Sequence, residues 1–312
     1  MEIDVSIIIA NWNGENILQD CINSIYGKAL AIKYEIIVVD DCSSDQSIEL
    51  INKLYPEVIL IVNENNLGFA KTNNVGVKYA QGKYIFLLNN DTILRNNVLK
   101  IFFDFMESNP TVAVCGGTLL NTYGTRQISY GNFPSMTEAI HGALMLYKLF
   151  PNSGWVKQKG IIPDHTSNNI IEVDYVSGAA FFIRKSIVDK LGLFDESFEA
   201  YCEETDLCYR LKKSDWWSVK YIPEAEITHL YSYSYDSIKE KRLRTQLISY
   251  DIYLNKHYGK LYVIIVRSLY ALQHIFSLMF RITQLLGINN ASHKNKIRED
   301  LFCLKYYIFS KL

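Results

Sequence analysis

The chain has 312 residues, of which 49% are hydrophobic and 21% charged, and this composition excludes a disordered protein. The formal net charge of −1 is unevenly distributed, because residues 255–312 carry nine Lys and Arg against two Asp and Glu. Residues 1–254 are therefore acidic, which argues against nucleic acid as a partner, since duplex binding needs a basic face.

The six cysteines and the N-terminus bear on the cellular compartment. The cysteines are scattered and lack zinc-ligand spacing, so we expect reduced thiols. The first residues show no charged segment followed by an apolar one, so we expect no secretory signal and a cytoplasmic location.

Short apolar runs alternate with helix-like segments in the first third of the chain, a pattern typical of a βαβ layer with a mainly parallel sheet. The predicted strands are 5–10, 35–40, 58–62, 84–88 and 112–116. The predicted helices are 16–26, 48–54, 68–80 and 97–107. In open α/β sheets, ligands bind beyond the carboxyl ends of the strands. Asn and Asp follow the first four strands at those ends, which predicts one polar crevice.

Two common phosphate-binding motifs are missing from the sequence. No G-x-G-x-x-G follows the first strand, and no G-x-x-x-x-G-K-[ST] occurs, which argues against a dinucleotide dehydrogenase and a P-loop NTPase. A divalent cation held by carboxylates is the usual alternative for offsetting diphosphate charge.

Several segments occur in the order seen in a known family. They are V-S-I-I-I-A-N-W-N-G, I-I-V-V-D-D-C-S-S-D, N-L-G-F-A-K-T-N-N-V-G, Y-I-F-L-L-N-N-D-T, V-S-G-A-A-F-F-I-R-K, L-G-L-F-D-E-S-F and E-E-T-D-L-C-Y-R-L, with His229 after them. Over about residues 3–232 the chain resembles the inverting family-2 glycosyltransferases with the GT-A fold. The resemblance implies an α/β, Rossmann-like domain over 1–254, with a nucleotide-sugar-binding half (1–118) and an acceptor-binding half (119–254). A helical, amphipathic, basic tail follows over 255–312.

The resemblance also implies a donor site, in which Asp40 and Asp41 contact the base and ribose of a nucleotide-sugar. The N-terminus of the helix over 68–80 would face the sugar and diphosphate. An acidic turn that caps the next helix is the alternative for the aspartates, and tight packing is the alternative for the glycines of that segment. The predicted donor-binding residues are Asn11, Asn13, Asp40, Asp41, Lys71, Asn73, Asn74, Asn89, Asn90 and Asp91.

A metal site is implied where Asn89-Asn90-Asp91 replaces the family's D-x-D signature. Asp91 would bind Mg²⁺ or Mn²⁺ directly, while Asn89 offers only a neutral oxygen, so we expect weaker binding than at a two-carboxylate site. His229 resembles the family's third metal ligand. A simple Asn-Asp turn and a structural histidine remain the alternatives.

The segment Glu203-Glu204-x-Asp206 is implied to carry the general base. The resemblance assigns this role to Glu204, although the choice between Glu203 and Glu204 stays open. Paired acids raise one another's pKa, which suits a base. An acidic first turn of the helix over 206–213 is the alternative. The predicted acceptor-binding residues are Ser177, Gly178, Ala179 and Asp206.

The expected reaction is a single displacement with inversion at the anomeric carbon. The N-N-D-T motif looks most like the rhamnosyltransferase branch, which uses dTDP-rhamnose, and the expected acceptor is a hydroxyl of a glycan or lipid-linked molecule in cell-surface polysaccharide synthesis. One alternative is a sugar-1-phosphate nucleotidyltransferase, which needs a basic, glycine-rich loop where residues 11–14 have no Lys or Arg. The other is a catalytically silent, transferase-like scaffold at a membrane.

The tail is strongly apolar over 261–288, but Arg267, His274 and Arg281 interrupt it at seven-residue intervals. We therefore expect no membrane-spanning helix. A helical projection places Arg267, Gln273, His274, Ser277, Arg281 and Gln284 in one polar arc. This pattern predicts a helix in the membrane interface, whose basic stripe, extended by Lys294, Lys296 and Arg298, attaches the protein peripherally to the inner face of the cell membrane. A helical cap on the catalytic domain or a homodimer contact is the alternative.

Overall fold

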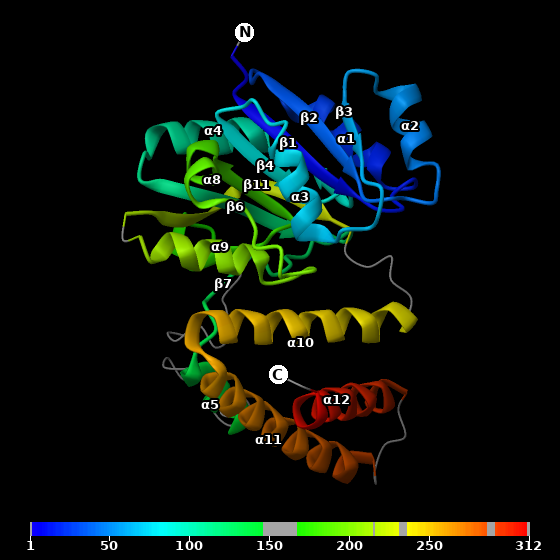
Figure 1. The fold of residues 1–312 in the computed structure, drawn as a ribbon, viewed down its shortest axis with the longest axis vertical. Coiled ribbons are helices and arrows are strands. Elements are labelled where there is room, and N and C mark those ends of the chain that lie inside the picture. Colours follow the sequence, from blue (N-terminus) through cyan, green and yellow to red (C-terminus); the bar gives the residue numbers. More distant parts are fainter. Residues whose placement is uncertain (1, 146–166, 215, 231–235, 286–290, 311–312) are drawn as a thin grey trace. The chain divides into compact units, whose positions relative to one another are not determined.

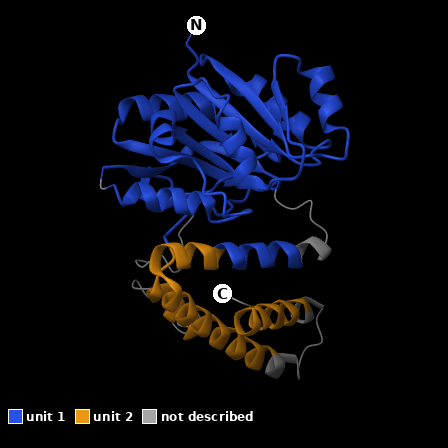
Figure 2. Ribbon diagram, viewed as in Figure 1, with its two compact units in different colours: residues 1–133, 165–249 blue, residues 134–164, 250–312 orange. Residues whose placement is uncertain are grey.

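A computed structural model describes residues 2–145, 167–214, 216–230, 236–285 and 291–310. The chain forms two compact units (Figure 2): unit 1 comprises Met1–Phe133 and His165–Ser249, and unit 2 comprises Pro134–Asp164 and Tyr250–Leu312. The two units divide near residue 250, and the expected domain boundaries stay a prediction. The segment Pro134–Asp164 joins the C-terminal unit, whereas the sequence boundaries placed it in the acceptor-binding half.

Unit 1 is built on a mixed sheet of nine of the described strands, in the order β3-β2-β1-β4-β10-β6-β11-β5, with β8 beside β11. These strands are β1 (Val5–Asn11), β2 (Tyr34–Asp40), β3 (Ile59–Val62), β4 (Tyr84–Leu88), β5 (Thr92–Leu94), β6 (Val112–Leu120), β8 (Ile171–Val173), β10 (Ala180–Arg184) and β11 (Ser218–His229). A separate pair consists of β7 (Tyr130–Gly131) and β9 (Tyr175–Val176).

The expected parallel arrangement holds for β3, β2, β1 and β4, which run parallel to one another. The remainder is mixed, because β10 lies antiparallel between β4 and β6, while β11 pairs in parallel with β6 and antiparallel with β5. Strand β10 is thus a sequence-distant segment inserted between β4 and β6.

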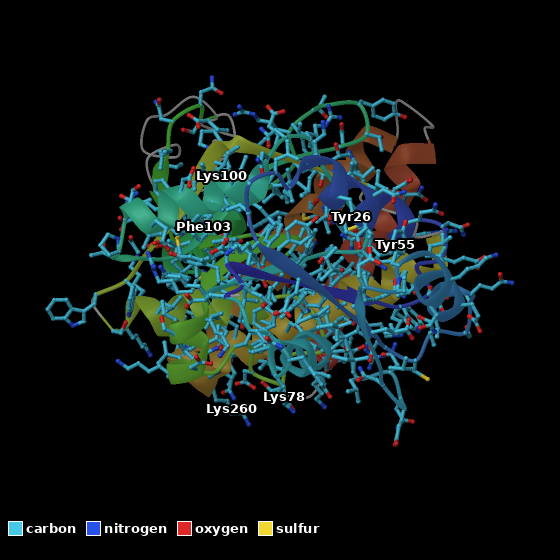
Figure 3. The ribbon with its side chains drawn as sticks, turned by 90° about the horizontal axis from the view of Figure 1, so that it is seen from above. Tyr26, Tyr55, Lys78, Lys100, Phe103 and Lys260 are labelled. Carbon is cyan, nitrogen blue, oxygen red and sulfur yellow. The ribbon has the colours of Figure 1, made fainter. Side chains whose placement is uncertain are left out.

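Helices cover both faces of the sheet (Figure 1). Those of unit 1 are α1 (Leu18–Lys28), α2 (Ser47–Leu54), α3 (Phe69–Val77), α4 (Val98–Ser108), α8 (Lys185–Leu191) and α9 (Glu203–Lys212). Apolar residues of α1, α2 and α4 form one core with the sheet, and those of α3, α8 and α9 form a second core on the opposite face. Tyr26 and Tyr55, labelled in Figure 3, pack at the first face with ring centroids 6.0 Å apart.

Unit 2 is helical in its described part. It contains α5 (Met136–Ala143), α11 (Lys260–Leu285) and α12 (Ala291–Phe309), together with the end of α10 (Asp236–Tyr258). Helix α11 packs against both α5 and α12. Over Lys260–Arg281 it is long and apolar enough to cross a membrane, with a mean hydropathy of 1.6. The three interrupting polar residues leave the mean hydropathy of this helix high, and the expectation of no membrane-spanning helix stays a prediction.

Candidate functional site

Side chains at the ends of β1, β2 and β4 form one hydrogen-bonded chain. Asn11 Nδ2 donates to Asp40 Oδ2 (2.8 Å), and Asn90 Nδ2 donates to Asn11 Oδ1 (2.8 Å). Asp40 also accepts bonds from Ser43 and is fully buried. The predicted crevice-lining residues Asn11, Asp40 and Asn90 thus meet at one edge of the sheet. Asp40 also orders the loop that follows β2. A Cβ at Gly14 would overlap Asn11 and come within 2.6 Å of Asn90 Nδ2, so only glycine fits beside this chain.

Asp41 holds the loop that leads into α3. Its Oδ1 accepts from Leu67 N (2.8 Å) and its Oδ2 accepts from Gly68 N (2.9 Å). Gly68 has a φ of +84°, and a Cβ there would lie 2.9 Å from the carbonyl oxygen of Glu199. Because Phe69 N donates to that same oxygen (3.0 Å), Asp41 and Gly68 connect the end of β2 to the loop before α9. The role predicted for Asp41 in binding base or ribose stays a prediction beside this structural one.

The predicted donor residues of α3 divide into two groups. Asn73 is buried and donates to Phe69 O (2.9 Å), while Asn74 exchanges two hydrogen bonds with the backbone of Phe194 (2.9 and 3.0 Å). Both amides therefore hold α3 in place. Lys71, in the first turn of α3, forms no ion pair within the described part of the chain, so its ammonium is available to an anion at that helix end. Asn13, exposed and at φ 52°, accepts from Ser44 N (2.8 Å) at the rim.

The predicted metal ligands come together across the sheet. Strand pairing sets His229 of β11 opposite Thr92 of β5, the residue after Asp91. His229 Nε2 lies 3.2 Å from Asp91 Oδ1 and 3.5 Å from Asn89 Nδ2. Asn89 Oδ1 is buried and has no hydrogen-bond partner. Since an amide's oxygen and nitrogen exchange places on a flip, Asn89 can turn an oxygen toward the same point.

The candidate metal ligands Asp91, His229 and Asn89 offer one carboxylate, one imidazole and one amide. Across the described ranges, no group of three or more His, Cys, Asp or Glu side chains gathers as a metal site. A carboxylate and an imidazole nitrogen 3.2 Å apart either share a proton or face a cation. Together with the unpartnered Asn89 oxygen, this geometry fits a divalent cation held by fewer charges than a two-carboxylate site offers.

Glu203 and Glu204 form a coupled acid pair at the start of α9. Burial raises the pKa of Glu203 well above its ordinary value, and the charge of Glu204 adds to this. Burial also raises the pKa of Glu204, to about 6, although hydrogen bonds, one of them from Glu203, limit the rise. Burial thus favours a proton on this pair, and the pKa of Glu203 rises more than that of Glu204. Oxygen Oε2 of each is buried and unpartnered in the described structure, and so can receive a hydroxyl.

The segment 177–179 joins the acid pair to the metal-ligand cluster. Ala179 O accepts from Asn89 N (3.0 Å), and an added Cβ at Gly178 would lie 3.8 Å from Glu203 Oε1 and 3.9 Å from Glu204 Cβ. Ser177 is half-buried, and its Oγ accepts from Ala179 N (3.3 Å). The predicted acceptor segment thus borders both groups of polar side chains.

Asp206 lies elsewhere than the acceptor-binding prediction requires. Its side chain is completely buried, and Oδ2 pairs with Arg210 Nε at 2.9 Å. Arg210 in turn donates to the carbonyl oxygens of Leu191 and Leu193. Because Asp206 points into the packing of α9, an acceptor has no access to its carboxylate, and we correct its role to anchoring the helix that carries the acid pair.

Two features of the site have no recognisable sequence signal. Gln127 Oε1 lies 3.1 Å from His229 Nδ1, and its Nε2 donates to His229 O (2.7 Å), a contact that depends only on how the chain folds. Tyr201 and Cys202, directly before the acid pair, both have positive φ (68° and 64°). Non-glycine residues in this conformation store strain, which is common beside functional groups.

Comparison with known proteins gives a consistent picture. The model of the family "Glycosyl transferase family 2" matches residues 6–192. The chain is 23% identical over 216 residues to the low-salt glycan biosynthesis hexosyltransferase Agl10 of Haloferax volcanii, covering 68% of this chain and 62% of that protein. It is 25% identical over 211 residues to the N-acetylglucosaminyl-diphospho-decaprenol L-rhamnosyltransferase of Mycobacterium tuberculosis, covering 62% and 66%. The chain thus spans under two thirds of the length of Agl10.

Solved structures share the fold. The structure of TarS from S. aureus has a TM-score of 0.51 at 15% identity, covering 99% of this chain and 44% of TarS. A structure of GalNAc-T7 with UDP, GalNAc and Mn²⁺ has a TM-score of 0.58 at 16% identity, covering 98% of this chain and 56% of that one.

Proposed function

Because this chain belongs to glycosyl transferase family 2 and has the GT-A fold, we propose that it transfers a sugar from a nucleotide-sugar to an acceptor hydroxyl. The observation that carries the proposal is the segment 177–179, which borders the Glu203–Glu204 pair on one side and Asn89 on the other. A base and an anion-facing cluster on either side of one segment are what displacement of a nucleoside diphosphate by a hydroxyl requires.

In the proposed reaction, Glu204 accepts the proton of the acceptor hydroxyl as its oxygen attacks the anomeric carbon. The bond between that carbon and the diphosphate oxygen breaks, and the nucleoside diphosphate leaves from the opposite face, which inverts the anomeric configuration. Glu203 stays protonated and keeps Glu204 oriented by the hydrogen bond between them. The unpartnered Glu204 Oε2 supports this role, because an acceptor hydroxyl would satisfy it.

We propose that Asp91, His229 and Asn89 hold Mg²⁺ or Mn²⁺. Bound there, the cation would supply positive charge to the departing diphosphate. Gln127 Oε1 lies 3.1 Å from His229 Nδ1 and holds the ring with Nε2 toward Asp91, the orientation in which Nε2 would bind the cation. Lys71 at the N-terminus of α3 adds a second positive group for the same anion.

The proposed donor is dTDP-rhamnose, and the proposed acceptor is a glycan or lipid-linked hydroxyl in cell-surface polysaccharide synthesis. The relative named as an L-rhamnosyltransferase supports this donor, while Agl10 is named only as a hexosyltransferase. The deciding experiment is a panel of nucleotide-sugars with Mg²⁺ or Mn²⁺, in which binding is read as a rise in melting temperature and turnover as release of nucleoside diphosphate.

The same panel separates the alternatives. A nucleotidyltransferase would release pyrophosphate from a nucleoside triphosphate and a sugar-1-phosphate, whereas a silent scaffold would bind nucleotide without releasing any diphosphate. Either result would refute the transferase proposal, and the choice of sugar would be decided by which donor is consumed.

A further inference from the structure

The polarity of α11 is inverted relative to that of a helix on a water-soluble protein. Its exposed apolar residues follow one helical face; they are Leu261, Ile264, Ile265, Leu272, Ile275, Phe276, Met279 and Phe280. Met279 and Phe280 are 60% and 53% exposed. Over Lys260–Arg281 only 22% of this apolar stretch is buried, so α11 is not the core helix of unit 2.

The two arginines of α11 form ion pairs with aspartates of unit 2. Arg267, only 6% exposed, forms a two-pronged ion pair with Asp251 (Nη2 to Oδ2, 2.7 Å), to which Tyr306 also donates. Arg281 and His274 both contact Asp300, at 2.7 and 2.8 Å.

Ser277 also contacts Asp300, since its hydroxyl donates to Asp300 Oδ2 (2.9 Å). These contacts correct the expectation that Arg267, His274 and Arg281 form a basic stripe toward lipid head groups, because the two arginines pair with buried aspartates and His274 lies against Asp300. Gln284, expected in the polar arc, and Lys294, expected on the basic surface, have side chains outside the described ones.

Among the described side chains of the outer face, Ser268 is polar and exposed, and its hydroxyl donates to its own helix at Ile264 O (2.8 Å). The donor of this hydroxyl is thus satisfied within the helix, and the other exposed side chains named on this face are apolar, whereas protein interfaces usually contain about one hydrogen bond per 100–200 Å². A hydrocarbon environment needs no partner and requires that polar groups be satisfied internally.

Exposed cations flank the apolar face. Lys260, labelled in Figure 3, begins α11, and Lys296 and Arg298 lie on α12. Contacts of Asp300 with Arg281, and of Ser310 with Arg267, show that α12 runs antiparallel to α11. Lys296 and Arg298 thus lie toward the C-terminal end of α11 and Lys260 at its N-terminal end. Cations at both ends of an apolar helix can lie among the lipid head groups while the apolar face between them contacts hydrocarbon.

We propose that α11 lies in the plane of a lipid bilayer with this outer face in the hydrocarbon, held by apolar burial rather than by charge. A transmembrane orientation is disfavoured, because α12 packs along α11 and exposes Lys296, Arg298 and Lys305, which hydrocarbon would not accept. Attachment therefore withstands high salt and does not need anionic lipid. This proposal is independent of the proposed function.

The test is flotation of the full chain with vesicles of phosphatidylcholine alone, and of phosphatidylcholine with phosphatidylglycerol, at low and high salt. We expect binding to both, retained at high salt. The double variant Ile275→Asp/Met279→Asp should lose binding by about a hundredfold or more, since each buried apolar side chain contributes roughly tenfold. The control is Leu30→Asp, which adds the same charge at an exposed leucine of unit 1. This variant should bind vesicles as the unaltered chain does.

A second measurement covers the case in which the double variant misfolds. Met279→Trp should gain fluorescence that brominated phosphatidylcholine quenches, while Leu30→Trp should not. Binding only to anionic vesicles with release by salt would overturn the proposal in favour of the electrostatic mode. A stable dimer without vesicle binding, dissociated by Met279→Asp, would assign the face to a second copy of the chain instead.

Discussion

Oε1 of Gln127 lies 3.1 Å from Nδ1 of His229, and the backbone oxygen of His229 accepts from the same amide. Gln127 therefore fixes the ring orientation of the histidine. Nε2 faces Asp91 Oδ1 at 3.2 Å. In metal sites, such an outer partner commonly determines how well the histidine binds.

We expect Gln127→Leu to weaken metal affinity by about 10–100-fold, because the imidazole then loses its orienting acceptor. Mn²⁺ titration of nucleotide binding measures the effect. Ile128→Ala, at the exposed neighbouring residue, is the control and should leave the titration unchanged. Unaltered Mn²⁺ affinity in Gln127→Leu would show that His229 is not a ligand.

Asp91→Ala should abolish turnover, since it removes the charged ligand of a site that has one carboxylate. Chelation of the wild-type protein with EDTA should have the same effect, and added Mn²⁺ should restore activity. The measurement is nucleoside diphosphate release. If turnover survives EDTA unchanged, charge on the diphosphate must be met by Lys71 or another cation.

Glu204→Gln should lower turnover by roughly 10²–10⁴-fold while donor binding stays nearly intact, because glutamine keeps the shape and loses the basicity. Glu203→Gln is the matched control: its neutral amide still donates to Glu204, so we expect at most about a tenfold loss. The opposite order of the two variants would assign the base to Glu203.

Activity should fall as the pH drops through about 6, where burial sets the pKa of Glu204 and where protonation removes the base. The same raised pKa has a consequence for stability. A carboxyl whose folded-state pKa exceeds its unfolded one favours folding at low pH and loses that contribution as the pH rises through the folded pKa. Glu204→Gln should therefore raise the melting temperature at pH 8, and this gain should shrink toward pH 4.5. An equal gain at both pH values would contradict the buried, charged state of Glu204.

Gly14→Ala should destabilise the fold by about 1–3 kcal/mol, because its Cβ would displace Asn11 or Asn90 from the chain that links three strand ends. Gly27→Ala provides the control, since nothing lies within 4 Å of a Cβ at this exposed position of α1. It should stabilise by about 0.5–1 kcal/mol through helix propensity. Urea unfolding of both variants makes the comparison.

The sequence by itself determined the first four strands and the helices between them, whose observed bounds differ from the predicted ones by a few residues. It also placed Asn11, Asp40 and Asn90 at one sheet edge. Both results depend on local patterns, since apolar periodicity marks an element and polar residues mark its end.

Tertiary structure alone decided how distant charges are paired. Strand pairing brings His229 beside Asp91 across 138 positions of sequence, and packing turns Asp206 away from the acceptor segment toward Arg210. The same holds for Arg267, which periodicity placed correctly on one face of α11 but could not assign to lipid or to Asp251. A helical projection gives the direction of a side chain, whereas the partner it meets depends on which other element packs there, and that is a non-local property of the folded chain.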